Sequence, residues 1–293
     1  MAVNREMLDD IVRKWKREGP TWPGRLARKR QALSGTTCNH YMAVLRRGYS
    51  LAKEKWGLAT ALTFPKTPDS ASARGRYLPP AAFYAIHAQL PTADIRDVAE
   101  LAYLTGVRKG QLRVTEHANV VVKHVGGAER WELSWRGEQT KAGKRDGQPH
   151  TVPLTGRALA IIKAAAAANR REACPFLFHS IKCGRLTKRH HADDPCLGRF
   201  QAEWTRACEA AGVPCGRKAG GYVFHNTRHS AVTNMTGAGI PDSVATTITG
   251  HRSLAIFKRY GIRQESVQRA ALEKVESYVR NLSDPPAADR GAA

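Results

Sequence analysis

The sequence predicts a mainly α-helical chain with one small antiparallel β-sheet, an α+β fold arranged in two domains. Three observations lead to this prediction. A length of 293 residues suits about two domains of ordinary size. Apolar residues recur near a 3.6-residue period along most of the chain, and only three short stretches resemble strands. Residues 65–76 are rich in Pro, Ser and Ala, lack periodicity, and therefore indicate a linker.

The first domain, residues 1–64, is expected to be all-helical. Two short basic helices are predicted at Glu6 to Arg17 and at Arg25 to Leu33, separated by Gly-Pro and Pro-Gly breaks. The longest predicted helix spans residues 36–57, with Thr36 or Ser34 as its cap and Gly57 near its end. Its apolar residues near helical spacing, which we expect to pack, are Tyr41, Val44, Leu45, Ala52 and Trp56.

The second domain, residues 77–282, is expected to hold the sheet. Helices are predicted at residues 79–89 and 95–105, and strands begin at Asn119, Glu129 and His150. Gly126-Gly127 and residues 140–147 supply the turns between the strands. Helices return from Ala158 onward, the last of them at residues 264–282, and the tail 283–293 is expected to be disordered.

The charge balance points to a polyanionic partner. Lys and Arg number 47 against 25 acidic residues, a formal charge of +22. Residues 1–76 alone carry 16 basic and 6 acidic side chains. Because neutralised phosphates release condensed counterions, nucleic acid is the expected partner. There is no 18-residue apolar run and no signal-peptide core, so we expect no membrane association and a cytoplasmic, nucleoid-associated protein. The six cysteines are then expected to be reduced.

Four segments together carry a candidate chemistry. YLTGVRKGQL places Arg108 just after a glycine at a helix end, and EQTKAGKRDG places Lys141 on the turn between two strands. FHNTRHS places His225 and Arg228 three residues apart, on one face of a helix if Asn226 caps it. The stretch ITGHRSLAIFKRYG holds the remaining two groups, His251 and, nine residues later, Tyr260.

These groups suit phosphodiester cleavage without a metal or ATP. Two guanidiniums can clamp the oxygens of one phosphate and stabilise a pentavalent phosphorane. A tyrosine hydroxyl can attack the phosphorus, a histidine can manage its proton, and a lysine can protonate the leaving oxygen. The covalent phosphotyrosine conserves the energy of the broken strand, so the strand can be rejoined.

The motifs TGVRKGQL, QTKAGK, HNTRHS, TGHRS and RYG, in this order, resemble the catalytic domain of the tyrosine recombinase, or phage integrase, family over roughly residues 77–278. The helix TTCNHYMAVLRRGYSLAKEKWGL is similar to the last helices of that family's SAM-like core-binding domain. The resemblance implies a site-specific recombinase on double-stranded DNA that integrates or excises a mobile element or phage. It also implies a homotetramer on paired sites, assisted in some systems by DNA-bending or directionality proteins, and no cofactor.

The same resemblance implies a role for each site residue. Arg108 and Arg228 would be the phosphate clamp, and Lys141 the general acid toward the 5′-hydroxyl. Tyr260 would form the 3′-phosphotyrosyl link, with His225 as its acid/base partner and His251 hydrogen-bonded to the phosphate. Three residues beyond Lys141, Lys144 can contact DNA or substitute for it.

Two departures from the family's pattern keep alternatives open. Gln111 stands where the family usually has a carboxylate that supports the active-site histidine, and an amide cannot stabilise an imidazolium electrostatically. About 35 residues precede the long helix, fewer than a full core-binding domain normally supplies, so that domain is expected to be short. The alternatives are a type IB topoisomerase-like enzyme and a catalytically impaired DNA-binding relic.

Two further predictions concern DNA contacts and metals. The candidate DNA contacts in the first domain are five cationic or polar groups on the long helix: Asn39, His40, Arg46, Arg47 and Lys53. The segment CPFLFHSIKCGRLTKRHHADDPC contains Cys174, His179, Cys183, His190, His191 and Cys196. Its spacing contains no compact ligand pair of the CxxC type, so a metal site is not expected.

Overall fold

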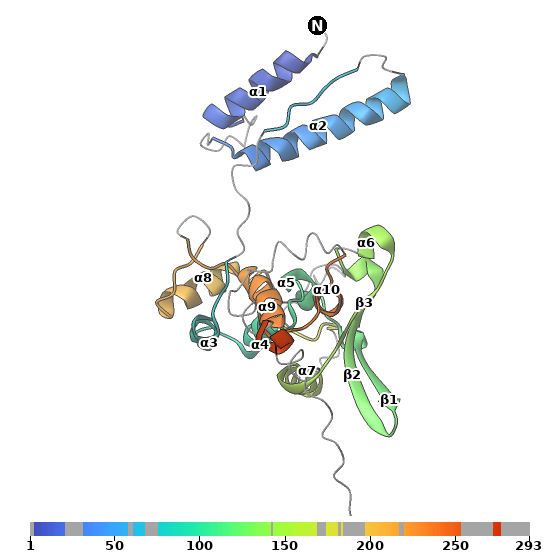
Figure 1. Ribbon diagram of the computed structural model, residues 1–293, viewed down its shortest axis with the longest axis vertical. Helices are drawn as coiled ribbons and strands as arrows, with labels where there is room; N and C mark the ends of the chain where they lie inside the picture. Colours follow the sequence, from blue (N-terminus) through green and yellow to red (C-terminus); the bar gives the residue numbers. More distant parts are fainter. Residues whose placement is uncertain are drawn as a thin grey trace, which may run out of the picture. The chain divides into compact units, whose positions relative to one another are not determined.

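The computed structural model describes residues 3–20, 32–57, 61–67, 76–141, 143–168, 174–180, 183, 197–216, 220–252 and 272–276. The chain divides into two compact units, Met1–Arg74 and Gly75–Ala293, which are drawn with their elements labelled in Figure 1. Each unit has a hydrophobic cluster of its own. Within the described ranges, no helix combines the length and the apolar character that a membrane span requires.

Unit 1 contains helices α1 (Arg5–Arg17) and α2 (Gly35–Trp56). The side chain of Asn4 caps α1, and the side chain of Ser34 caps α2 by accepting a hydrogen bond from the backbone N–H of Thr37. Gly57 ends α2 in the left-handed conformation, which a residue without a Cβ adopts at little cost. The predicted bounds of both helices are confirmed. All but the last two residues of the helix expected at Arg25 to Leu33 lie outside the described residues.

The packing face predicted for the long helix is wrong in part. The buried residues of unit 1 are Leu8 and Val12 of α1 and Cys38 and Met42 of α2. Val44 and Trp56, by contrast, are 70% and 72% exposed. For Trp56 the physical reason is length: 13 residues of α1 span about 20 Å and 22 residues of α2 about 33 Å, so α1 covers only part of its partner. For Val44 the reason is the face of the helix, because it follows the buried Met42 by two residues and so lies about 200° around α2 from it.

Unit 2 holds the other elements, which appear along the chain as α3 (Pro80–Ala88), α4 (Ala93–Thr105), α5 (Lys109–Arg113), η2 (His117–Asn119), β1 (Val120–Val125), β2 (Ala128–Trp135), η3 (Gly137–Gln139), α6 (Gly143–Asp146), β3 (His150–Pro153), α7 (Gly156–Ala168), α8 (Gln201–Ala210), α9 (Asn226–Gly237) and α10 (Asp242–Thr249). This is a mainly helical unit with one small sheet, as predicted. Residues 272–276 are helical, but the rest of the helix predicted at 264–282, and the whole tail 283–293, lie outside the described residues.

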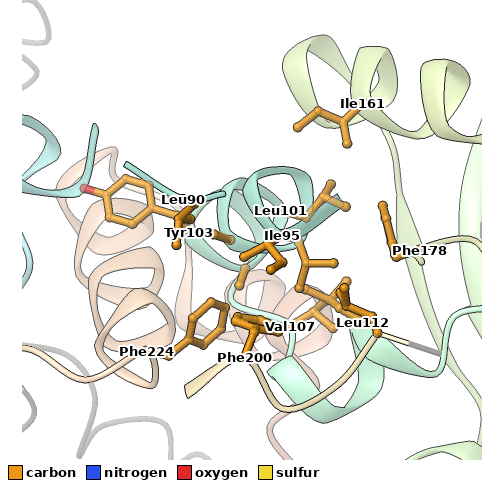
Figure 2. Close-up of a cluster of buried hydrophobic side chains, with 14 of the residues drawn as sticks. Leu90, Ile95, Leu101, Tyr103, Val107, Leu112, Ile161, Phe178, Phe200 and Phe224 are labelled. Carbon is orange, nitrogen blue, oxygen red and sulfur yellow. The ribbon is translucent and has the colours of Figure 1, made fainter. Parts of the chain in front are cut away.

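Helix α4 forms the centre of unit 2. It packs against α3, α5, α7 and α9, and its residues from Val98 to Tyr103 are all buried. Leu101 and Tyr103 of α4 lie in the same cluster as Phe178, Phe200 and Phe224, which come from segments far along the chain (Figure 2). The core therefore fixes the carboxyl end of α4, where the candidate site begins.

The sheet is a three-stranded antiparallel ribbon in the order β1-β2-β3. Gly126 and Gly127 close the β1-β2 hairpin with φ angles of 59° and 77°, as a two-residue hairpin turn requires. The β2-β3 register pairs Leu133 with Val152 and Trp135 with His150. These pairs face the core, so His150 enters the interior of the unit at the start of β3.

Candidate active site

Three segments that lie far apart in the sequence meet at two glycines. Gly106 ends α4 and Gly250 ends α10, with φ angles of 68° and 67°, a conformation that favours glycine. A Cβ on Gly106 would lie 2.8 Å from Cγ2 of Thr249, and a Cβ on Gly250 would lie 2.8 Å from Cε1 of His150. Both positions therefore require glycine for backbone conformation and for space, and helix α9 packs against α4 and α10 beside them.

Arg228 of α9 is the buried connection between these segments. Its side chain is among the largest that are fully buried, with 1% of its surface exposed. Nη1 donates to the carbonyl oxygens of Gly106 and Thr249, and Nη2 lies 2.7 Å from Nε2 of His251. The guanidinium thus holds the ends of α4 and α10 together, because a planar fork of donors can serve several acceptors at once.

Arg108 makes the reciprocal connection. It occupies the N-cap position of α5, is half-buried, and donates from Nη1 to the carbonyl oxygen of Gly250 over 3.2 Å. One arginine therefore binds the glycine at the end of α4, and the other binds the glycine at the end of α10. Hydrogen bonds to carbonyl oxygens orient both guanidiniums without removing their positive charge.

His251 is held neutral in this site. Its side chain is 6% exposed, and burial together with the charges of Arg228 and Arg108 lowers its pKa to about 3. Because a guanidinium only donates, Nε2 of His251 is the acceptor from Arg228. The proton of the neutral ring then lies on Nδ1, which is 2.7 Å from Oγ1 of Thr249. The structure therefore places His251 directly beside Arg228, which sets its tautomer, and Thr249 receives the proton on Nδ1.

His150 is a buried site residue that the sequence interpretation missed. Its Nδ1 lies 2.7 Å from the side-chain nitrogen of Gln111, and its Nε2 donates to the carbonyl oxygens of Thr247 and Ile248. Burial lowers the pKa of His150, so the ring is neutral and its Nδ1 accepts from the amide. The alternation of the strand HTVP, which puts His150 on the same side as the buried Val152, is the signal that could have indicated it.

This arrangement corrects the interpretation of Gln111. The family resemblance implied that the residue at this position supports the active-site histidine, a role in which an amide would be deficient. In the structure Gln111 binds His150, and because that ring is neutral an amide is a suitable partner. The pair His150 and Gln111 supports the backbone of α10 just ahead of Gly250.

A hollow of about 240 Å³ opens on these groups. This volume is ample for a tetrahedral oxyanion such as one phosphate group. Its lining includes two arginines, which carry positive charge, and three neutral side chains with ring or amide nitrogens. These residues are Arg108, Arg252, Gln111, His150 and His251. Arg228 lies behind His251 and does not line it.

His225 is placed apart from the buried cluster. It precedes α9, is exposed, and makes an edge contact with the ring of His229 at 5.3 Å. It lines a separate hollow with Lys109. Asn226 does not cap α9 as expected: it is the first residue of the helix, and its side chain binds the backbone of Val223 and Arg76. His225 and Arg228 therefore share a helix turn but differ completely in burial.

Lys141 lies on an exposed loop rather than on a simple turn. The connection between β2 and β3 contains two short helices, η3 and α6, and Lys141 lies between them. The backbone of this connection is tightly packed at Gly137 and Gly143, where a Cβ would lie 2.5 Å from backbone atoms. Lys144 is also exposed, and neither lysine has a side-chain hydrogen bond or ion pair with another described residue. Arg252 joins this loop to the site through Asp146 at 3.1 Å.

Tyr260 lies outside the described residues. Of the expected site residues, Arg108, Arg228 and His251 are in one cluster, while His225 and Lys141 are exposed around it. Arg252, Thr249 and His150 join this set only through the tertiary structure.

The candidate DNA contacts of unit 1 differ in their surroundings. His40, Arg46, Arg47 and Lys53 are exposed on α2, and the guanidinium of Arg46 lies 5.6 Å from the ring centre of Phe64. The amide of Asn39, in contrast, exchanges two hydrogen bonds with the backbone of Thr67. Asn39 therefore anchors the chain after α2, and its role as a DNA contact stays a prediction.

Comparison with known proteins places this chain in context. Residues 81–266 match the sequence model of the phage integrase family, a span that includes Arg108, Lys141, His225, Arg228, His251 and Tyr260. A comparison with curated proteins gave no match.

Several solved structures share the fold. XerH site-specific recombinase, bound to a palindromic difH substrate after cleavage, has a TM-score of 0.60 and 13% identity over 95% of this chain and 73% of its own. A Tn1549 transposon integrase fragment in complex with circular intermediate DNA has a TM-score of 0.60 and 15% identity over 92% of this chain and 85% of its own. A lambda integrase tetramer bound to a Holliday junction has a TM-score of 0.57 and 16% identity over 90% of this chain and 67% of its own.

Proposed function

Because this chain belongs to the phage integrase family, we propose that it is a site-specific DNA recombinase that cuts and rejoins strands through a 3′-phosphotyrosyl intermediate. The observation that carries the proposal is the junction at Gly106 and Gly250. There Arg108 and a neutral His251 line one hollow large enough for a phosphate, and Arg228 holds His251 from behind. Preorganised donors of this kind stabilise the charge that develops on a phosphorane.

The phosphate would enter the hollow beside Arg108, which lines it. Gly250 orients Nη1 of Arg108 and so places the guanidinium at the hollow, where a guanidinium can donate to the nonbridging oxygens of a phosphate. Arg228 supports the same site from behind, through His251. A phosphate oxygen that displaces the bond between Arg228 and His251 would gain the guanidinium as a direct donor. The charge of Arg228 acts on the phosphate in either arrangement.

Strand cleavage requires a nucleophile and an acid. We propose that Oη of Tyr260 attacks the phosphorus, that His225 accepts the tyrosine proton, and that Lys141 donates a proton to the departing 5′ oxygen. One P–O bond forms as another breaks, so the step is reversible and needs no ATP. The exposed positions of His225 and Lys141 support these roles, because both groups can be reached by DNA on the surface.

Unit 1 is proposed to be the SAM-like core-binding domain, with residues 65–76 as the linker to a catalytic domain at 77–282. The exposed cations Arg46, Arg47 and Lys53 on α2 support a role in holding the DNA backbone. His40 is exposed on the same helix and remains a proposed contact. Lys144, on the loop beside Lys141, is proposed to contact the backbone as well.

The biological reaction is proposed to be integration or excision of a mobile element or phage, carried out at the nucleoid by four copies of the chain on two DNA sites. The lambda integrase tetramer on a Holliday junction, which shares the fold, supports this assembly. DNA-bending or directionality proteins would act as accessory partners.

Covalent trapping tests the proposed function. The purified chain would be incubated with nicked suicide duplexes tiled across the DNA that flanks its gene, and adducts stable in SDS would be scored by gel. Wild type should give an adduct at one site, and Tyr260→Phe should give none while retaining salt-sensitive binding. An adduct formed by Tyr260→Phe would refute the nucleophile assignment.

Two further outcomes distinguish the alternatives. Relaxation of supercoiled plasmid without any specific site would favour a type IB topoisomerase-like enzyme, whereas deletion or inversion between two defined sites would favour a recombinase. Tight binding without cleavage anywhere in the tiled DNA would favour a relic. For variants that remove a surface positive charge, such as Lys141→Ala, the control is Lys16→Ala on α1, because Lys16 lies outside the proposed contacts.

A further inference from the structure

A second cluster of reactive side chains lies in unit 2, apart from the proposed active site. The thiols of Cys174 and Cys183 and the imidazole of His179 each offer a ligand atom, and these three atoms lie within 4.8 Å of one another. The three residues are 7%, 7% and 2% exposed. Two thiols and one imidazole in a buried group match the donor set of zinc sites in proteins.

We propose that Cys174, His179 and Cys183 bind one zinc ion with a structural role, as three of the four ligands of a tetrahedral site, with a water molecule as the fourth. An ion at the centre of a triangle with sides of 4.8 Å lies about 2.8 Å from each corner. Zinc takes sulfur ligands at about 2.3 Å and nitrogen ligands at about 2.1 Å. Each side chain thus needs to move inward by less than about 1 Å, a distance that side-chain rotation supplies.

The donor types favour zinc over other divalent ions. Thiolate ligands select soft or borderline metals, whereas calcium and magnesium require oxygen ligands. Two cysteines and a histidine therefore exclude the hard cations as occupants. A zinc ion bound by thiolates has no redox chemistry of its own, and this agrees with a role in holding the chain rather than in catalysis.

Asp94 lies beside the histidine, where a small movement of the ring would bring its carboxylate into contact with Nδ1. Its Oδ2 accepts a hydrogen bond from the backbone N–H of His179 and lies 4.0 Å from Nδ1 of the same ring. Carboxylates beside metal-binding histidines orient the ring and raise its basicity. Because Asp94 lies in the first turn of α4, the proposed ion is linked to the central helix of unit 2.

The position of the cluster explains what zinc would stabilise. Between Cys174 and His179, the chain inserts Phe176, Leu177 and Phe178 into buried positions (Figure 2 labels Phe178). The same segment pairs with the chain after α5 through hydrogen bonds between Pro175 and His117 and between Thr115 and Leu177. The ion would therefore clamp a segment that lies against α5, the helix at whose start Arg108 is located.

The sequence argued against a metal because no compact ligand pair is present. The structure changes that interpretation since burial of the apolar run between Cys174 and His179 folds the chain back on itself. A turn that binds the N–H of Cys183 to the carbonyl of Ser180 then returns the second thiol to the first. Ligands that are five and four positions apart in the sequence are thus brought together by the core.

Metal analysis of the full chain tests this proposal. The protein would be purified without chelator, and its zinc content would be measured by elemental mass spectrometry. We expect about one zinc per chain. Cys174→Ser and Cys183→Ser should reduce that content at least tenfold, whereas Cys215→Ser, which alters a thiol outside the cluster, should leave it unchanged.

Two measurements on unaltered protein keep the test valid if a variant does not fold. Replacement of zinc by Co²⁺ should produce the visible absorption of a tetrahedral site with thiolate ligands. Removal of zinc by a chelator should lower the thermal unfolding midpoint by about 5 °C, reversibly. Protein that contains no zinc and gives no such Co²⁺ spectrum would overturn the proposal. So would peptide mapping that shows a disulfide between Cys174 and Cys183.

Discussion

The buried junction at Gly106 and Gly250 and the exposed loop between β2 and β3 illustrate two ways to position cationic groups. At the junction, Arg228 is enclosed and bound to carbonyl oxygens on two other segments. On the loop, Lys141 and Lys144 face solvent. The contrast suggests that phosphate-stabilising groups are preorganised by the fold, whereas the proposed general acid takes its final position when DNA binds.

The strongest test of this contrast is removal of the buried cation. Arg228→Ala leaves the carbonyl oxygens of Gly106 and Thr249 and the Nε2 of His251 without their donor. We expect the free energy of unfolding of unit 2 to fall by about 3 to 5 kcal/mol. Urea denaturation measures this change. Lys141→Ala should alter the same quantity by less than about 0.5 kcal/mol, and equal losses for the two variants would remove the distinction.

On the loop, substitution of Lys141 should reduce the rate of cleavage strongly while it leaves stability almost unchanged. If Lys141 is the general acid, Lys141→Ala should slow cleavage of a trapping duplex by a factor of about 10² to 10⁴, with the fold intact. Lys144→Ala should slow it by less than about tenfold. A substrate with sulfur in place of the 5′ bridging oxygen should restore the rate of the Lys141 variant, because a thiolate leaves without protonation. Absence of rescue would argue against the acid role.

A smaller effect is expected when the glycines themselves are altered. Gly106→Ala places a Cβ 2.8 Å from Thr249 at a φ of 68°, and we expect a loss of about 2 to 3 kcal/mol. Gly110→Ala, in α5, has no atom within 4 Å of the new Cβ and a helical backbone, so it should be neutral or stabilising. Thermal unfolding of both variants measures the difference. If both lose stability equally, close packing at Gly106 is not the cause.

The smallest effect is a dependence of stability on pH. The pKa of His251 is lowered to about 3 in the folded chain, whereas an unfolded histidine titrates near 6.5. Below pH 6.5 the unfolded chain binds the extra proton, so stability falls as the pH falls from 6.5 toward 3. At pH 5 His251 should contribute a loss of about 2 kcal/mol relative to pH 7.5.

The variant His251→Gln isolates this contribution, because other groups also titrate in the range. Burial lowers the pKa of His229 to about 4 in the same way, so the wild-type curve contains more than one histidine. The difference between wild-type and variant stability, measured by urea denaturation at pH 5 and 7.5, should shrink in acid by the stated amount. A difference that does not vary with pH would show that His251 titrates normally.

Features that depend on neighbouring residues could be predicted from the sequence, whereas features that depend on distant residues could not. The ends of α1 and α2 and all three strands were predictable because caps, turn glycines and periodicity are local signals. The exposure of Val44 and Trp56 was not, because it depends on which face of α2 is covered and on how far α1 reaches along it. The partner of Gln111 was not predictable either, since His150 lies 39 residues away.

Taken alone, the sequence determined the helices and strands, the excess of positive charge, and which residue types are available for phosphate chemistry. Only the tertiary structure decided that Arg228 is enclosed while His225 is exposed, that His251 accepts from Arg228, and that two thiols meet one imidazole. Local elements follow from interactions within a few residues, whereas burial and protonation depend on groups far apart in the chain that the core brings together, such as Arg108 and the carbonyl of Gly250, 142 positions away.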